Sequence, residues 1–234
     1  MFQSKSGPKK AAEDADHWMS VSDLMSGLMI VFLFISILLM RNALGERDKI
    51  KEVAVTYQNN QVALYENLKK EFQNDLDAWN ADIDPLTLAF EFKSPDVLFQ
   101  TGSAIIKPAF RHILDDFFPR YLKVLSQFRH SLNEIRIEGH TSSQWNQQTP
   151  PEEAYFRNMA LSQERTRSVL LYIQNMDAVK SEKEWIRQNM AAVGFSSSRL
   201  VLDEHGHEDA ERSRRVSFRV MTNAETQIRK ILQD

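Results

Sequence analysis

Cysteine is absent from the 234 residues. This absence excludes disulfide bonds, thiol catalysis and zinc sites with cysteine ligands. Neither sign of charge dominates, since the formal net charge is −3, and the composition therefore indicates no nucleic-acid partner. The sequence also lacks a Ser-His-Asp spacing, a phosphate-binding loop and a carboxylate pair in a plausible pocket, so we expect no enzyme.

A histidine- and acid-rich stretch, Asp203 to Asp209, is the one segment whose composition suggests a metal site. It holds two histidines in a charged loop but no third positioned ligand. Metal sites need several ligands at fixed spacing, so we expect these side chains to be solvated and predict no metal and no cofactor.

One long apolar run organises the chain. Met19 to Met40 carries a single charge, Asp23. As a helix the run would span about 33 Å, enough to cross the ~30 Å hydrocarbon core of a bilayer. It is longer than the apolar part of a signal peptide and is followed by Arg41 and Asn42 rather than a small-residue cleavage site. We therefore expect an uncleaved, single-pass transmembrane helix over residues 18–41.

Asp23 would lie inside the hydrocarbon near its edge. An ionised carboxylate there costs about 2.5–3.5 kcal/mol on insertion scales. Ser26 and Gly27, with Ser20, fall within about 60° of it on a helix, which gives one small, polar face able to line a path for ions. We favour an ion-transferring carboxylate. The alternative is an acid near the interface that reaches headgroup water.

The segments on either side of the apolar run are polar or amphipathic. Residues 1–17 are polar and of mixed charge, which predicts a short flexible tail. Residues 42–84 predict a helical linker, because apolar residues from Ile50 to Trp79 recur mostly at three- and four-residue steps. Gln61 interrupts this stripe. Two ways of covering it stay open: pairing with a second copy of the chain, or folding back on the following domain.

The remaining residues, 85–234, alternate between strand and helix patterns. The expected strands are 86–93, with alternating Leu86, Leu88, Phe90 and Phe92, then 135–139, 192–195 and 215–221. The expected helices are 108–127, 150–172, 182–190 and a short terminal one. This order predicts an α+β domain.

Three blocks within that domain resemble the OmpA-like peptidoglycan-binding family. They are Phe99–Ala104, Ile137–Thr141, and Asn158-x-x-Leu161-Ser162-x-x-Arg165, which leads on to Arg214. The resemblance implies a βαβαβ-type sheet with helices on one side. It also implies that Asn158, Leu161, Arg165 and Arg214 bind the peptide stem of peptidoglycan. Arginine forks suit the carboxylates of such a stem.

The sequence departs from that family at one position. The family commonly has an aspartate after His-Thr, where it holds the amine of the ligand, but here the residue is Ser142. A longer loop with Trp145 and two glutamines follows. Glu152 or Glu153 could supply the missing carboxylate.

The apolar run resembles the membrane helix of MotB-type stator subunits, in which an aspartate carries the ion. The matching residues are Trp18 and the stretch from Asp23 through Ser26-Gly27 to Leu33. Among such subunits we prefer a resemblance to the B subunits of Zorya anti-phage systems, because the helix after the membrane is long and lacks an obvious plug. Flagellar MotB is the alternative within the same class of protein. A second alternative is a protein that only tethers the membrane to the cell wall and has no ion path.

The MotB-type resemblance implies partners and a location. The partners are a second copy of the chain, a ring of a MotA-like multi-pass membrane subunit, and peptidoglycan. The location is the bacterial inner membrane, with a cytoplasmic N-terminus and a periplasmic C-terminal domain. Flanking lysines and arginines do not decide the orientation. The transported ion would be a proton, with sodium as the alternative.

Overall fold

The computed structural model describes residues 9–93 and 98–223, and for residues 9–17 and Ser20 the backbone alone. The chain divides into two compact units, with a boundary between Val53 and Ala54. The helices and strands, in chain order, are α1 (Lys9–Phe72), β1 (Ala81–Ile83), β2 (Ala89–Lys93), α3 (Pro108–Ser126), β3 (Leu132–His140), α4 (Pro151–Asn175), α5 (Lys183–Asn189), β4 (Met190–Ser196), α6 (Ala210–Ser213) and β5 (Arg215–Thr222), with two short 3₁₀ helices at Arg129–Ser131 and Asp177–Glu182.

The first unit is helical where it is described. All of the side chains from residue 21 to residue 49 are exposed, although the segment to Met40 is almost wholly apolar. α1 contains the one stretch, among the described residues, that is long and apolar enough to cross a membrane. An apolar helix with no buried face requires a lipid or protein environment to cover it. The sequence prediction of a membrane helix agrees with this finding.

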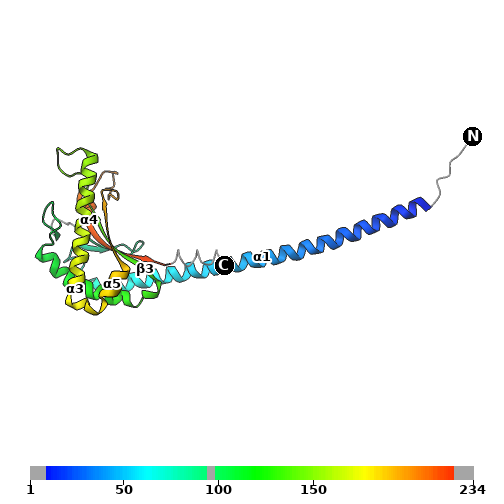
Figure 1. Cartoon of the computed structure of the whole chain (residues 1–234), viewed down its shortest axis with the longest axis horizontal. Helices are drawn as coiled ribbons and strands as arrows, with labels where there is room; N and C mark the ends of the chain where they lie inside the picture. The colour runs from blue at the N-terminus through cyan, green and yellow to red at the C-terminus, as the bar shows by residue number, and fades with distance from the viewer. Residues whose placement is uncertain (1–8, 94–97, 224–234) are drawn as a thin grey trace, which may run out of the picture. The chain divides into compact units, whose positions relative to one another are not determined.

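The second unit is built on a five-stranded sheet with the order β1-β2-β5-β3-β4. β3 and β4 run parallel, and the other neighbours are antiparallel. α4 packs against β3 and β4, and α5 also contacts β3 (Figure 1). The α+β class with helices on one side of a mixed sheet is thus confirmed.

The core lies between α3 and the sheet and is rich in aromatic rings. Phe117 of α3 is fully buried. The centre of its ring lies 4.6 Å from that of Phe90, 5.1 Å from that of Phe92 and 5.1 Å from that of Phe218. Phe90 and Phe218 are directly paired across β2 and β5, so one ring of α3 covers two strands. The alternation expected for residues 216–220 is correct, because Val216, Phe218 and Val220 all point into this core.

The linker helix ends earlier than the sequence predicted. α1 stops at Phe72, turns follow, and β1 (Ala81–Ile83) joins the edge of the sheet. Leu64, Leu68 and Phe72 are buried in the core, so the end of α1 belongs to the domain, which begins before residue 85. Of the two ways to cover the apolar stripe, the structure shows folding against the domain for these residues.

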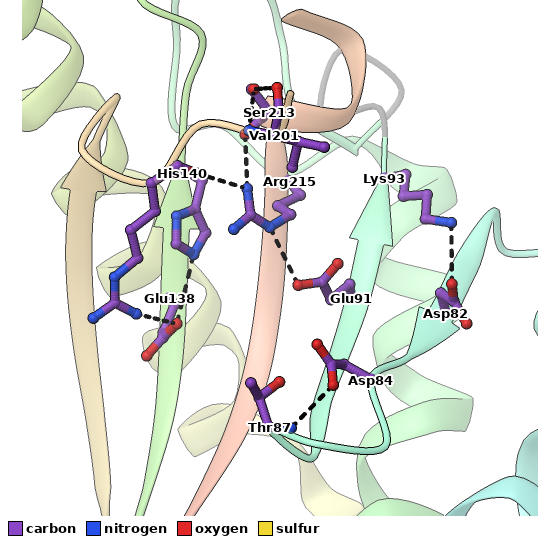
Figure 2. Close-up of polar contacts among 11 residues, drawn as sticks. Asp82, Asp84, Thr87, Glu91, Lys93, Glu138, His140, Val201, Ser213 and Arg215 are labelled. Carbon is purple, nitrogen blue, oxygen red and sulfur yellow. Dashed lines mark hydrogen bonds and ion pairs between the residues drawn. The ribbon is translucent and has the colours of Figure 1, made fainter. Parts of the chain in front are cut away.

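The Asp84-Pro85 step ends no helix. It forms the turn of the β1–β2 hairpin, in which Asp84 Oδ1 accepts a hydrogen bond from the backbone nitrogen of Leu86 at 2.7 Å. The same oxygen accepts one from the backbone nitrogen of Thr87 at 3.0 Å (Figure 2). Leu86 is therefore 81% exposed in the turn, and β2 begins only at Ala89. An aspartate that satisfies turn amides explains why the alternating pattern did not extend to Leu86. The expected terminal helix lies outside the described residues.

Candidate functional site

The small, polar face predicted around Asp23 lies on α1. Ser26, three residues on, donates a hydrogen bond from Oγ to the carbonyl of Ser22 at 2.8 Å, which satisfies its hydroxyl within the helix. A Cβ added at Gly27 would meet no atom within 4 Å, so this face is open to close approach by another helix. The role of Asp23 in ion transfer stays a prediction.

In the second unit, α4 lies unusually close to the sheet because two paired glycines face it. Gly139 of β3 and Gly194 of β4 are partners in the parallel register. A Cβ at Gly139 would lie 2.8 Å from the carbonyl oxygen of Ser162, and one at Gly194 would lie 2.5 Å from the backbone nitrogen of Gln163. Only glycine permits this approach, which fixes the height of α4 above the sheet.

Hydrogen bonds of two serines stabilise the same contact between α4 and the sheet. Ser162 Oγ accepts a hydrogen bond from the backbone of Ser196 at 3.1 Å, and Ser196 Oγ donates to the carbonyl of Tyr155 at 2.6 Å. Ser196 ends β4 with φ of +52°. The Asn-x-x-Leu-Ser motif thus includes a serine whose task is to dock the helix that carries the other motif residues.

Asn158 holds a loop in place. Its side chain is 4% exposed, and Nδ2 donates to the carbonyls of Ser142 at 3.1 Å and Gln144 at 3.3 Å. The sequence resemblance placed Asn158 in contact with the ligand. The structure shows its amide positioning the loop after β3, which we name the 142–146 loop.

Arg165 and Leu161 both lie beside the segment that follows Phe99. Arg165 is 5% exposed, donates from Nε to the carbonyl of Ser103 at 3.0 Å and has its guanidinium 5.0 Å from the centre of the Phe99 ring. Leu161 is half-buried and lines an open hollow together with Gly102 and Trp145. The structure thus brings the first and third sequence blocks into contact, and the approach of Gly139 to Ser162 joins the second block to the third.

Arg214 lies at the start of β5, between α6 and the strand. Because β5 is antiparallel to β3 and Arg215 pairs with His140, Arg214 comes next to the point where the 142–146 loop leaves β3. Ser213, just before it, is fully buried, and its Oγ accepts a 2.8 Å hydrogen bond from the backbone nitrogen of Val201. Arg214 and the loop held by Asn158 therefore share one end of the sheet.

A carboxylate that the sequence reasoning missed reaches this end. Glu208, half-buried, accepts hydrogen bonds from the backbone nitrogen of Ser143, at 2.8 Å, and from its hydroxyl. Glu153, which the sequence offered as one possible replacement for the missing aspartate, accepts a hydrogen bond at Oε1 from Nε of Arg157 at 2.9 Å. In the sequence, Glu208 is only one acid in a charged loop. It lies 65 residues after Ser143, so no local pattern could connect the two residues.

A buried acid–histidine pair lies on β3 beside the site. Glu138 and His140 are each 3% exposed, with Nε2 of His140 3.5 Å from Oε2 of Glu138 (Figure 2). Burial lowers the pKa of His140 below its ordinary value, against the opposing pull of Glu138. Burial raises the pKa of Glu138, but the hydrogen bond and charge of His140 and the charges of Arg219 and Arg199 outweigh it, so the net direction is downward. The imidazole also stacks on Phe195 at 5.2 Å, which suits a structural role.

The histidine-rich loop forms turns. Asp203 Oδ1 accepts hydrogen bonds from the backbone of His205 at 2.8 Å and His207 at 2.9 Å. Within residues 9–93 and 98–223, no group of three or more His, Cys, Asp or Glu side chains is arranged to hold a metal ion.

Residues 98–214 match the model of the OmpA family. The Zorya protein ZorB of Escherichia coli (strain Crooks) is 55% identical over 227 residues, which is 97% of this chain and 96% of that protein.

Two solved structures are similar at lower identity. One is the cell wall anchor of the T6SS from Pseudomonas aeruginosa, with 21% identity, coverage of 66% of this chain and 96% of that one, and a TM-score of 0.45. The other is a putative MotB-like protein from Desulfovibrio vulgaris, with 20% identity, coverage of 75% and 94%, and a TM-score of 0.47. From its identity to ZorB along nearly its whole length, and from the OmpA-family match over the site just described, the chain belongs to the ZorB family and carries an OmpA-family domain.

Proposed function

We propose that this protein is an ion-driven motor subunit of an anti-phage defence complex, anchored to peptidoglycan by its C-terminal domain. The observation that carries the proposal is the 55% identity to a Zorya ZorB protein over 97% of the chain, which includes both the apolar helix and the domain. The protein would act as a homodimer inside a ring of a MotA-like membrane subunit. It would cross the bacterial inner membrane once, with its N-terminus in the cytoplasm.

Asp23 is the group proposed to transfer the ion, a proton or alternatively sodium. Its carboxylate lies on the face of α1 that also carries Ser26 and Gly27, with the apolar bulk of the helix mostly elsewhere. Moving one elementary charge across the membrane supplies about 2.3 kcal/mol per 100 mV. A ring that alternately buries and hydrates the carboxylate would raise and then lower its affinity for the ion, and so couple ion flow to rotation.

The domain is proposed to hold the dimer still against the cell wall. Arg165 and Arg214 supply positive charge for the carboxylates of a stem peptide. Glu208, fixed by Ser143, supplies a carboxylate beside Ser142, where the resemblance leads one to expect an aspartate. Asn158 and Leu161 shape the site between them. A stem peptide that carries both carboxylates and an amine would thus meet both signs of charge.

The test is phage plaquing on cells that carry the native operon with Asp23→Asn. Asparagine keeps the size of the side chain but removes the titrating group, so protection should be lost by at least tenfold in plaquing efficiency while the protein stays in the membrane at wild-type level. Asp48→Asn is the matched control, since Asp48 is an exposed acid on the same helix beyond the apolar run. It should leave protection intact.

Other results would reassign the protein. Full protection by Asp23→Asn would eliminate ion transfer and leave a passive wall tether. A defect in swimming, with no protection in the wild type, would identify a flagellar-type stator. Separately, the detergent-solubilised full chain should pellet with purified sacculi, and Arg165→Gln should weaken that binding. Failure of the wild type to pellet would remove the anchoring part of the proposal.

A further inference from the structure

The 142–146 loop presents an aromatic ring in a fixed position. Trp145 follows Gln144, whose carbonyl is held by Asn158 at 3.3 Å. It precedes Asn146, whose Oδ1 accepts hydrogen bonds from the backbone of Gln148 at 3.0 Å and from the hydroxyl of Thr149 at 2.7 Å. The loop is thus anchored immediately on both sides of the ring, so little conformational freedom remains to be lost when a ligand binds there.

Trp145 lines an open hollow of about 360 Å³ beside the stem-peptide site. Its other lining residues are Gly102, Arg157, Ala160, Leu161 and Glu164. Gly102 has a φ of +65°, and a Cβ there would meet no atom within 4 Å. The lining of the hollow is therefore partly apolar, from the Trp145 ring, Ala160 and Leu161, and partly charged, from Arg157 and Glu164.

Of the two charged groups in the lining, Arg157 is held in position. The guanidinium of Arg157 lies 5.9 Å from the centre of the Trp145 ring, and its Nε donates to Glu153 at 2.9 Å. Glu164 lines both this hollow and a neighbouring one, which is formed by Ser103 to Ile106 with residues of α3 and α4. A lining that combines an aromatic ring and apolar side chains with charged groups fits a flat ligand that has one apolar face and a hydroxylated or amide edge.

We propose that this hollow binds a sugar ring of the glycan strand, with the ring packed on Trp145 and its polar groups hydrogen-bonded to Arg157 and Glu164. The proposal rests on the anchoring function proposed above. Leu161 joins the two sites, because it lines the hollow and lies one helical turn before Arg165. A wall fragment whose peptide contacts Arg165 would therefore place its sugar at the hollow. The domain would recognise the glycan as well as the peptide.

The test measures binding of the full chain, in detergent, to three ligands: intact sacculi, glycan strands from which an amidase has removed the stems, and isolated stem peptides. Trp145→Ala should weaken binding to the stem-free glycan by at least fivefold and leave binding to isolated stems within twofold. Phe156→Ala is the matched control, because Phe156 is an aromatic on α4 that is 70% exposed and lies outside the hollow. It should change neither.

Each outcome decides a separate point. Wild-type binding to intact sacculi and isolated stems without any affinity for stem-free glycan would overturn the glycan subsite and leave the anchoring function standing. Equal glycan binding by Trp145→Ala and the wild type would overturn it as well. Absence of binding to intact sacculi would instead remove the anchoring function. Should Trp145→Ala lower the melting temperature, Trp145→Phe, which keeps an aromatic face, must retain most glycan binding for the proposal to hold.

Discussion

Replacing Gly194 with alanine should separate α4 from the sheet. The added Cβ would lie 2.5 Å from the backbone nitrogen of Gln163 and 2.6 Å from both its Cγ and the hydroxyl oxygen of Ser162. Carbon atoms in protein interiors approach other heavy atoms to about 3.5–4.0 Å, so the overlap approaches 1 Å. Since one of the opposing atoms is helix backbone, rotation of a side chain cannot relieve it. The whole helix must move.

The cost follows from the packing. Overpacking a dense core costs about 1–3 kcal/mol, and a backbone clash belongs at the upper end, so we expect about 3 kcal/mol. For a domain of this size that lowers the melting temperature by roughly 6–12 °C. Asn158 and Arg165 lie on the displaced helix, so binding to sacculi should also fall, even at temperatures where the domain stays folded.

Thermal unfolding of the full chain in detergent, followed by circular dichroism, measures the first effect, and co-sedimentation with sacculi measures the second. Gly139→Ala should behave similarly, because its Cβ would lie 2.8 Å from the carbonyl oxygen of Ser162. Gly45→Ala is the control, since nothing lies within 4 Å of a Cβ there. A Gly194→Ala protein that melts within about 1 °C of the wild type and binds sacculi equally would refute the close-approach argument.

Three further results are expected. Stability should fall as the pH drops below about 6.5, because unfolded His140 then takes up a proton that its buried, folded form resists; His140→Gln should flatten that part of a melting-temperature profile, and an unchanged slope would exclude His140 as the cause. Arg120→Met should cost about 1–2 kcal/mol in urea unfolding, because Arg120 pairs with Glu71 at 2.8 Å and its guanidinium lies 4.7 Å from the centre of the Phe72 ring. Arg187→Met, which removes an exposed ion pair, should change the free energy of unfolding by no more than about 0.5 kcal/mol, and equal effects of the two substitutions would contradict a stabilising role for the Arg120 contacts. Phe117→Ala should destabilise by about 4 kcal/mol in the same assay, and a loss below about 1 kcal/mol would show that the aromatic core collapses around the cavity.

Sequence patterns predicted most of the elements whose signals are local. Pro108 and Pro151 begin helices, as proline in a first helical turn should, and Val216, Phe218 and Val220 alternate into the core. Errors arose where two local signals competed. The Asp84-Pro85 pair is as typical of a helix end as of the hairpin turn that it forms. Leu86 fitted the alternation of apolar residues expected for a strand, but it lies in that turn and is exposed.

The site divides in the same way. The sequence alone determined the apolar run with Asp23, the motif on α4 and the presence of Arg214, because each is a property of neighbouring residues. Tertiary structure decided which groups meet. Asn158 proved to hold a loop, and Glu208 reached Ser143 from 65 residues away.

Gly139 and Gly194 likewise became neighbours only because β3 and β4 pair in parallel under α4. Helix and strand periods act over a few residues, whereas strand register and loop docking are set by the burial of the whole core. The residues that surround the Ser142 position could therefore be identified only from the folded chain.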